Sequence, residues 1–437
     1  MTKLYIAIHG WYEYWRRAAK TELGRDVVAL YVAQGLNYLV PLLVLPYLLR
    51  ILEPVEFGAI VFAQSLINYL RIVTNYGFNF SATREVALAR ERPQELRKIF
   101  WTTMAAKMCL LAGSLVIVVP LVFVVPFLRA RWPVIGICGL ALGGSILLPQ
   151  WYFQGMNRIR ELAIIQASSN VIMLLSTFVF VRSRGDELQA AGVLALPLVL
   201  SGIASLVFLK IVEPVRWYRP TLDGVREAIK SGWNLFVSGA ATSLYVNSNV
   251  FFIGLLCGNY QVALYSLANR IALAATGVLS PIVQASFPRA SVLFGMSVQR
   301  GLVFARKLSR YFLVISIVLS CILMFFARSI VIILGGIRYA DAVPVVRVLA
   351  LLPIAIGGAM ILSQIVMINL GLSRRMSHIY IMAGLVSVAL IIPLAAAYGA
   401  VGGAVALLIV EVTGPLLMLL SIRKWLRSTV SDRRAEM

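Results

Sequence analysis

The sequence predicts an all-α polytopic membrane protein with twelve transmembrane helices, arranged as two six-helix bundles around a central cavity. Three observations lead to this prediction. Of the 437 residues, 60% are hydrophobic and only 13% are charged. The apolar residues form long blocks of the length that crosses a bilayer. The cationic residues collect in alternate segments between these blocks, which is typical of a chain that crosses a membrane repeatedly.

Each transmembrane helix needs about 20 predominantly apolar residues. Twelve blocks meet this requirement, near residues 27–49, 57–79, 99–127, 133–154, 161–181, 189–210, 233–257, 261–286, 309–334, 343–369, 377–397 and 399–422. Several contain proline, including Pro41, Pro197 and Pro393. Proline is tolerated in such helices because neighbouring helices can satisfy the backbone groups that it frees.

The distribution of cations predicts the orientation of these helices. With both termini in the cytoplasm, 29 of the 40 Lys and Arg residues fall in cytoplasmic segments and 7 on the opposite side, while four lie inside the spans. Cytoplasmic loops of membrane proteins carry such an excess. A missed or invented span would invert every later loop, so the alternation supports both the count and the cytoplasmic termini.

A polar segment with Pro214 and Pro220 divides the blocks six to six. It predicts an N-terminal six-helix bundle at 27–212, a cytoplasmic linker at 213–232 and a C-terminal six-helix bundle at 233–422. Residues 1–26 are expected to form a cytoplasmic or interfacial segment, either an amphipathic helix or a disordered basic tail, and 423–437 a basic cytoplasmic tail. The two halves share one orientation, as parallel repeats of alternating-access transporters do.

Four cations lie inside the apolar blocks, namely Arg71, Lys107, Arg270 and Arg347, against a single acid, Glu411. Each such cation near the bilayer centre costs about 2.5–3.5 kcal/mol on insertion scales, so a functional role is expected. Arg347 lies near a helix end, where it can reach the interface. A guanidinium binds phosphate oxygens in pairs and an ammonium acts as a compact charge. Arg71, Arg270 and Lys107 are therefore candidates for binding a diphosphate, although Lys107 could instead face a helix interface.

A polar stripe accompanies Arg71 on the second block. Gln64, Asn68, Arg71, Asn75 and Asn79 are spaced to share one face of an α-helix, which predicts a wall of a water-filled cavity. Other candidate cavity-lining residues are Gln34, Asn37, Thr242, Tyr245, Asn249 and Ser266. For any one Ser, Thr, Asn or Gln, a hydrogen bond between packed helices, worth about 0.6 kcal/mol, is the alternative. Glu411 is a candidate coupling residue, with a salt bridge or a packing hydrogen bond as its alternative.

Short motifs in this frame resemble a known family. They are Pro149 to Gly155 (PQWYFQG), Tyr265 to Ala268 (YSLA) and Phe287 to Arg289 (FPR), together with the basic stretch from Ser81 to Lys98. In this order they resemble the Wzx-type O-antigen flippases, of the polysaccharide-transporter branch of the multidrug/oligosaccharidyl-lipid/polysaccharide exporter superfamily. The resemblance covers residues 27–422.

The resemblance implies a flippase of the cell inner membrane. Its substrate would be a polyprenyl-diphosphate-linked oligosaccharide repeat unit, of O-antigen or a related polysaccharide, moved from the cytoplasmic to the periplasmic leaflet by alternating access. Membrane lipids and O-antigen polymerase machinery are the expected partners. The uncharged polar groups would then contact sugars, while the lipid tail stays in the bilayer.

Other functions fit the sequence less well. A cation-coupled drug exporter of the same superfamily would need an acid inside the first or seventh helix, and only Glu411 is available. An enzyme acting on lipid-linked sugars would need a sizeable external loop, but the largest, near 327–342, has one acid, Asp341. A net charge of +22 without a nucleic-acid-binding motif does not predict nucleic-acid binding. With two histidines, His9 and His378, and four dispersed cysteines, we expect no metal, cofactor or disulfide framework.

Overall fold

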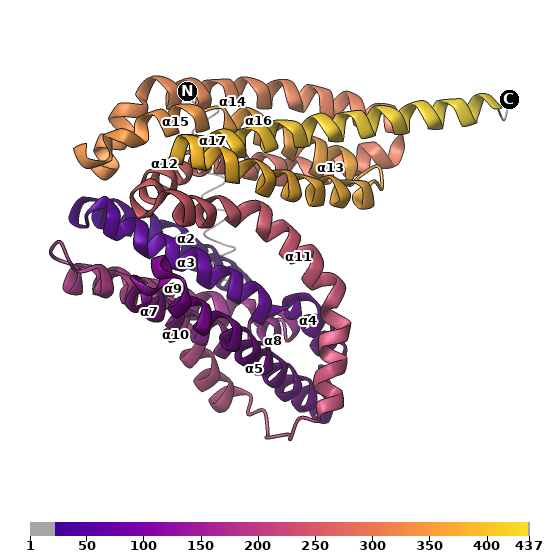
Figure 1. The fold of residues 1–437 in the computed structure, drawn as a ribbon. Coiled ribbons are helices and arrows are strands. Elements are labelled where there is room, and N and C mark those ends of the chain that lie inside the picture. The colour runs from indigo at the N-terminus through magenta and orange to yellow at the C-terminus, as the bar shows by residue number, and fades with distance from the viewer. Residues whose placement is uncertain (1–21, 436–437) are drawn as a thin grey trace, which may run out of the picture. The chain divides into compact units, whose positions relative to one another are not determined.

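The computed structural model describes residues 22–435 of the chain, which contain helices and no strand (Figure 1). Side chains are left undescribed at residues 22–32, 34, 38, 42, 234, 235, 238, 239, 241–247 and 428–435. The all-α fold class that the sequence predicts is therefore confirmed.

The helices follow one another with short connections. In chain order they are α2 (Glu22–Ile51), α3 (Pro54–Asn75), α4 (Phe78–Leu88), α5 (Pro93–Val124), α6 (Pro126–Arg129), α7 (Trp132–Leu147), α8 (Gln150–Gly155), α9 (Ile159–Phe180), α10 (Glu187–Val212), α11 (Leu222–Cys257), α12 (Asn259–Gly277), α13 (Ser280–Met296), α14 (Val298–Gly335), α15 (Val343–Leu349), α16 (Leu352–Met360) and α17 (Ser373–Ala435). A 3₁₀-helix, η1 (Ile337–Ala342), precedes α15, and a π-helix, η2 (Ile361–Met367), follows α16.

These helices form two compact units. Within the described residues, unit 1 comprises residues 22–51 and 69–236, and unit 2 comprises residues 52–68 and 237–435. The division passes through α3 and α11. Within the segment expected to be a linker, only residues 213–221 are irregular, because α11 begins at Leu222 and the Thr221 hydroxyl caps it by accepting the Gly224 N–H (3.2 Å). The predicted bundle boundaries remain a prediction.

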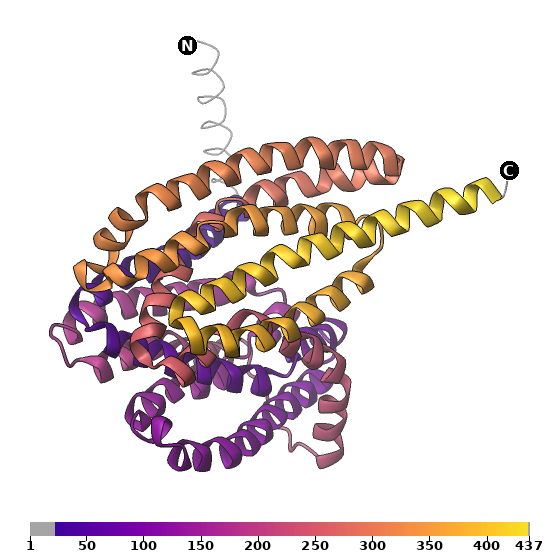
Figure 2. The ribbon, with the colours of Figure 1, turned by 45° about the horizontal axis from the view of Figure 1, so that its top comes forward.

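The chain is a multi-pass membrane protein. Among the described residues, eight helices are long and apolar enough to cross a membrane, or nine if η1–α15 and α16–η2, which meet at 42°, form one broken span. In this count of eight, α17 is one helix. Gly399, however, has a non-helical backbone (φ 57°), and Figure 2 shows α17 as two legs that run in opposite directions. The exact number of twelve spans remains a prediction.

In unit 1, two glycines bring α7 and α10 into close contact. A Cβ built on Gly144 would lie 2.5 Å from the Leu198 carbonyl carbon, and one on Gly202 would lie 2.6 Å from the Gly144 carbonyl oxygen. Small residues are common where membrane helices approach this closely, because van der Waals packing is a main driving force there. The α7–α10 contact therefore depends on having no side chain at either position.

The aromatic motif that follows α7 forms a short, separate helix. The expected fourth span, 133–154, corresponds to one candidate membrane span, Trp132–Gly155, in which the helix is interrupted at Leu148 and Pro149. Trp151, Tyr152 and Phe153 therefore lie on α8, where all three are buried. Their contacts with α4 are close. The Thr83 hydroxyl donates to the Trp151 carbonyl oxygen (3.2 Å). The motif thus fills the core at one end of unit 1.

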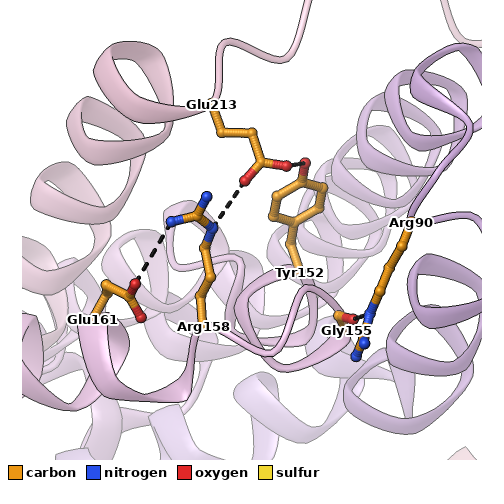
Figure 3. A network of polar contacts seen from close by, with 6 residues as sticks. All are labelled: Arg90, Tyr152, Gly155, Arg158, Glu161 and Glu213. Carbon is orange, nitrogen blue, oxygen red and sulfur yellow. Dashed lines mark hydrogen bonds and ion pairs between the residues drawn. The ribbon is translucent and has the colours of Figure 1, made fainter. Parts of the chain in front are cut away.

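A polar network joins α8 to the beginning of the irregular segment 213–221 (Figure 3). The Arg158 Nε lies 3.0 Å from a Glu213 carboxylate oxygen, and the Tyr152 hydroxyl donates to the other carboxylate oxygen (3.1 Å). Arg158 also lies 3.6 Å from Glu161, and Arg90 Nε donates to the Gly155 carbonyl oxygen (2.5 Å). These contacts fix the end of α10 to the rest of unit 1.

A second attachment follows a few residues later. The Trp101 indole N–H donates to the Arg216 carbonyl oxygen (3.1 Å), and the Trp101 and Trp217 rings meet edge to face at 4.3 Å. The irregular segment 213–221 is therefore held to unit 1 at two places.

Unit 2 contains its own apolar core and a stabilised chain reversal. Phe312 of α14, Ile365 of η2 and Met418 of α17 are among the buried residues of this core. At the break in α17, the Gln261 side-chain oxygen accepts the Ala400 N–H (2.9 Å). This bond satisfies a backbone donor that the break at Gly399 leaves without a helical partner.

We predict that Gly144→Ala destabilises the protein whereas Gly143→Ala does not. A methyl group at Gly144 meets backbone atoms of α10, and such overpacking costs about 1–3 kcal/mol. A Cβ at Gly143 meets no atom within 4 Å, and alanine there favours the helix by up to about 1 kcal/mol. Melting temperatures of the detergent-solubilised variants check this, and equal values for the two would contradict the close α7–α10 contact.

We also predict that Arg158→Gln exposes the segment 213–221 to trypsin, which can cleave there after Arg216 but not after Arg219, because Pro220 follows it. Loss of a partly exposed ion pair worth about 0.5–1 kcal/mol should speed cleavage roughly two- to fivefold. Arg92→Gln is the matched control, because it removes only an exposed pair with Glu95 (3.2 Å). Equal cleavage rates in the two variants would show that the network does not hold the segment.

Candidate functional site

Two of the predicted cations lie near each other in unit 1. Arg71, on α3, is half-buried, and Lys107, on α5, is almost completely buried, with 1% of its surface exposed. Arg71 is close enough for its positive charge to repel that of Lys107. Two like charges in an apolar environment disfavour one another.

The contacts of Lys107 place it at a helix interface. Its ammonium group donates to the Ser145 carbonyl oxygen of α7 (3.0 Å). This contact corresponds to the alternative considered for Lys107 from the sequence. An ammonium group has three N–H donors, so one carbonyl leaves capacity for an anion. Its binding role remains a prediction.

Arg270 lies on α12 in unit 2. Its side chain is exposed, and its guanidinium carbon lies 5.8 Å from the centre of the Phe57 ring. This is a cation–π arrangement, worth about 0.5–1 kcal/mol at an exposed site. Phe57 itself is buried, so the ring provides a fixed support for the guanidinium. Arg347 is also exposed, in the last turn of α15.

The polar stripe on α3 is four residues long rather than five. Gln64, Asn68, Arg71 and Asn75 lie on this helix and are all half-buried. Asn79 does not share their face, which corrects the prediction made from spacing. The helix ends at Asn75 because Tyr76 and Gly77 adopt left-handed backbone conformations (φ 45° and 81°), and Asn79 lies on α4.

Unit 2 contains a separate buried polar group. The Asn249 amide of α11 donates to the Tyr265 hydroxyl of α12 (3.0 Å), and Glu411 of α17 acts electrostatically on the same tyrosine. Ser266 lies beside Tyr265 and is also buried. Asn249, Ser266 and Glu411 were candidates from the sequence, but the contact of Asn249 with Tyr265 was not predicted. Because α11 ends between these two residues, helical spacing cannot relate them.

The remaining predicted residues have different positions. Asn37 accepts a hydrogen bond from the Asn170 amide of α9 (2.7 Å), which is the packing alternative for such a residue. The side chains of Gln34, Thr242 and Tyr245 lie outside the described residues. In the part of the chain that is described, no group of three His, Cys, Asp or Glu residues could hold a metal ion.

Comparisons with known proteins identify the family. A family model described as "Polysaccharide biosynthesis protein" matches residues 23–294. A protein of Escherichia coli (strain K12), named "Putative O-antigen transporter", is 32% identical over 92% of this chain and 97% of its own length. A protein of Shigella dysenteriae with the same name is 31% identical over 91% of this chain and 100% of its own length.

Solved structures show the same fold at low identity. An inward-facing multidrug resistance MATE transporter of the MOP superfamily has a TM-score of 0.70 at 13% identity, covering 94% of this chain and 99% of its own. The lipid II flippase MurJ, in an inward closed conformation, has a TM-score of 0.65 at 14% identity, covering 91% of this chain and 87% of its own. The chain has the fold of these transporters and belongs to the polysaccharide biosynthesis protein family, which confirms the resemblance found in its sequence motifs.

Proposed function

We propose that this protein is a flippase. It moves a polyprenyl-diphosphate-linked oligosaccharide repeat unit, of O-antigen or a related polysaccharide, from the cytoplasmic to the periplasmic leaflet of the inner membrane by alternating access. Its N- and C-termini lie in the cytoplasm, and O-antigen polymerase machinery acts on the product that it delivers. The names of the two curated relatives and of the lipid II flippase support this substrate class.

The pair of cations in unit 1 is the observation that carries the proposal. Two positive groups within electrostatic range of each other inside apolar helices are costly unless an anion offsets their charge. A diphosphate is a suitable anion, because its oxygens can accept two parallel hydrogen bonds from a guanidinium and further hydrogen bonds from an ammonium group. Arg71 and Lys107 thus bind the diphosphate, and in our proposal Arg270 of unit 2 binds it at another stage of transport.

The uncharged residues of the polar stripe suit the sugar part of such a substrate. Gln64, Asn68 and Asn75 can donate and accept hydrogen bonds with sugar hydroxyls, and they lie on the same helix as Arg71. Export of an anion is also favoured by an inside-negative potential, by about 2.3 kcal/mol per charge per 100 mV. In this proposal the chain binds and moves its substrate without chemical change, so no residue has a catalytic role.

We predict that Arg71→Ala and Arg270→Ala each abolish surface polysaccharide in a bacterial strain that depends on this protein for its display. Arg→Lys at the same positions should have a milder effect, because the charge remains while the paired donors are lost. Arg347→Ala is the control, since Arg347 is exposed at a helix end.

The measurement is the amount of polysaccharide on the cell surface, normalised to the amount of protein in the membrane. Full display in both alanine variants at normal protein levels would contradict the role of these cations. If the unaltered chain failed to restore display in the strain that expresses the matching polysaccharide, the flippase function itself would be wrong.

A further inference from the structure

Unit 1 contains a cavity that the proposed diphosphate site does not use. It has a volume of about 410 Å³ and lies where α4, the beginning of α5 and the first turns of α11 meet. Figure 1 shows these three segments beside one another. Its lining includes Glu85, Glu95, Lys98, Thr102, Thr103 and Glu227. The volume falls within the range of about 300–1,000 Å³ that is typical of small-molecule sites.

The charge of this cavity is opposite to that of the chain. Three carboxylates and one ammonium group line it, although the net charge of the protein is +22. Glu85 and Glu227 repel each other across it. Within the described part of the chain, neither forms an ion pair, and no group of acids is arranged to hold a metal ion. The carboxylates of Glu85 and Glu227 are therefore available as acceptors of hydrogen bonds, whereas Glu95 is paired with Arg92.

Two largely buried threonine side chains line the cavity in addition to these acids. Thr103 is 3% exposed and Thr102 is 8% exposed, and both line the cavity. Among the residues with described side chains, neither hydroxyl has a hydrogen-bond partner. Thr102 lies beside the beginning of α11. Its hydroxyl oxygen is 3.8 Å from the point that a Cβ built on Gly224 would occupy. Neither hydroxyl oxygen is among the buried polar atoms that lack a partner, so both face the space of the cavity, where a bound molecule or water can form hydrogen bonds with them.

The cavity lies next to the cations along α5. Thr103 and Lys107 are four residues apart on this helix, so they share a face, with about 6 Å of rise between them. Lys107 in turn lies within electrostatic range of Arg71. One ligand can therefore place a charged part at the cations and an uncharged polar part in the cavity.

We propose that this cavity binds an uncharged sugar residue of the lipid-linked oligosaccharide, next to its diphosphate. The inference rests on the proposed flippase function. Carboxylates accept strong hydrogen bonds from sugar hydroxyls, the Thr102 and Thr103 hydroxyls both donate and accept, and the Lys98 ammonium donates. The same carboxylates repel the diphosphate, so the substrate has one favourable orientation, with its sugar in the cavity and its diphosphate at Arg71 and Lys107.

The test measures binding of two probes to the purified full-length chain in lipid nanodiscs. Inorganic pyrophosphate probes the cations, and glucose, galactose and N-acetylglucosamine at millimolar concentrations probe the cavity by saturation-transfer NMR. Thr103→Val and Glu227→Gln should each weaken binding of the preferred sugar about tenfold, as expected for loss of one hydrogen bond to or from a charged or buried group, and leave pyrophosphate binding unchanged. Arg71→Ala should weaken pyrophosphate binding and leave sugar binding unchanged.

Two controls separate the role of the cavity from general destabilisation. Thr103→Ser keeps the hydroxyl and should retain sugar binding. Thr177→Val removes another buried threonine hydroxyl of unit 1, on α9, which donates to the Met173 carbonyl oxygen (2.7 Å) away from the cavity lining, and should bind sugar normally.

The outcomes distinguish this inference from the flippase proposal. If none of the sugars binds, or if binding is unchanged in both Thr103→Val and Glu227→Gln, the sugar site is wrong even where the protein restores surface polysaccharide. If spermidine binds in their place and is lost in Glu227→Gln, the cavity is a site for organic cations. If polysaccharide display is not restored by the unaltered chain, the flippase function fails, while sugar binding that depends on Thr103 would still establish the cavity as a sugar site.

Discussion

Unit 1 depends on one constraint, which is that a positive charge buried among apolar helices must be paired with a backbone carbonyl oxygen. Lys107 is kept in a membrane-spanning helix by the Ser145 carbonyl of α7, and α7 in turn contacts α10 through Gly144 and Gly202. A buried ammonium group without such a partner would cost several kcal/mol. The cation therefore depends on the position of α7, which in turn packs closely against α10.

Polar groups in the two units are used in different ways. In unit 1, cations lie one helical turn from an acidic cavity, so charges of both signs are separated along α5. In unit 2, Arg270 is supported by an aromatic ring, and Asn249 and Tyr265 form an uncharged buried pair near Glu411. Hence the two units differ in the chemistry of their polar groups.

Sequence patterns predicted the features that depend on composition and helical period. The apolar blocks predicted the membrane helices, and the residue spacing predicted that one helix face carries Gln64, Asn68, Arg71 and Asn75. Spacing failed at Asn79, because a left-handed turn at Tyr76 and Gly77 interrupts the period. The Lys107–Ser145 hydrogen bond and the cavity could not be predicted from the sequence. Each is formed by residues of different helices, and the packing that brings these helices together leaves no periodic pattern in the sequence.

The attachment of residues 213–221 has a consequence for the way the molecule can move. Glu213 and Trp217 hold this segment to unit 1, so the only irregular stretch between α10 and α11 cannot act as a free joint. Unit 1 instead carries the first turns of α11, and the division between the units falls inside that helix, after Phe236, and again inside α3, after Asn68. Any rearrangement of the two units would therefore have to be taken up by bending within α3 and α11 and by the short α2–α3 connection.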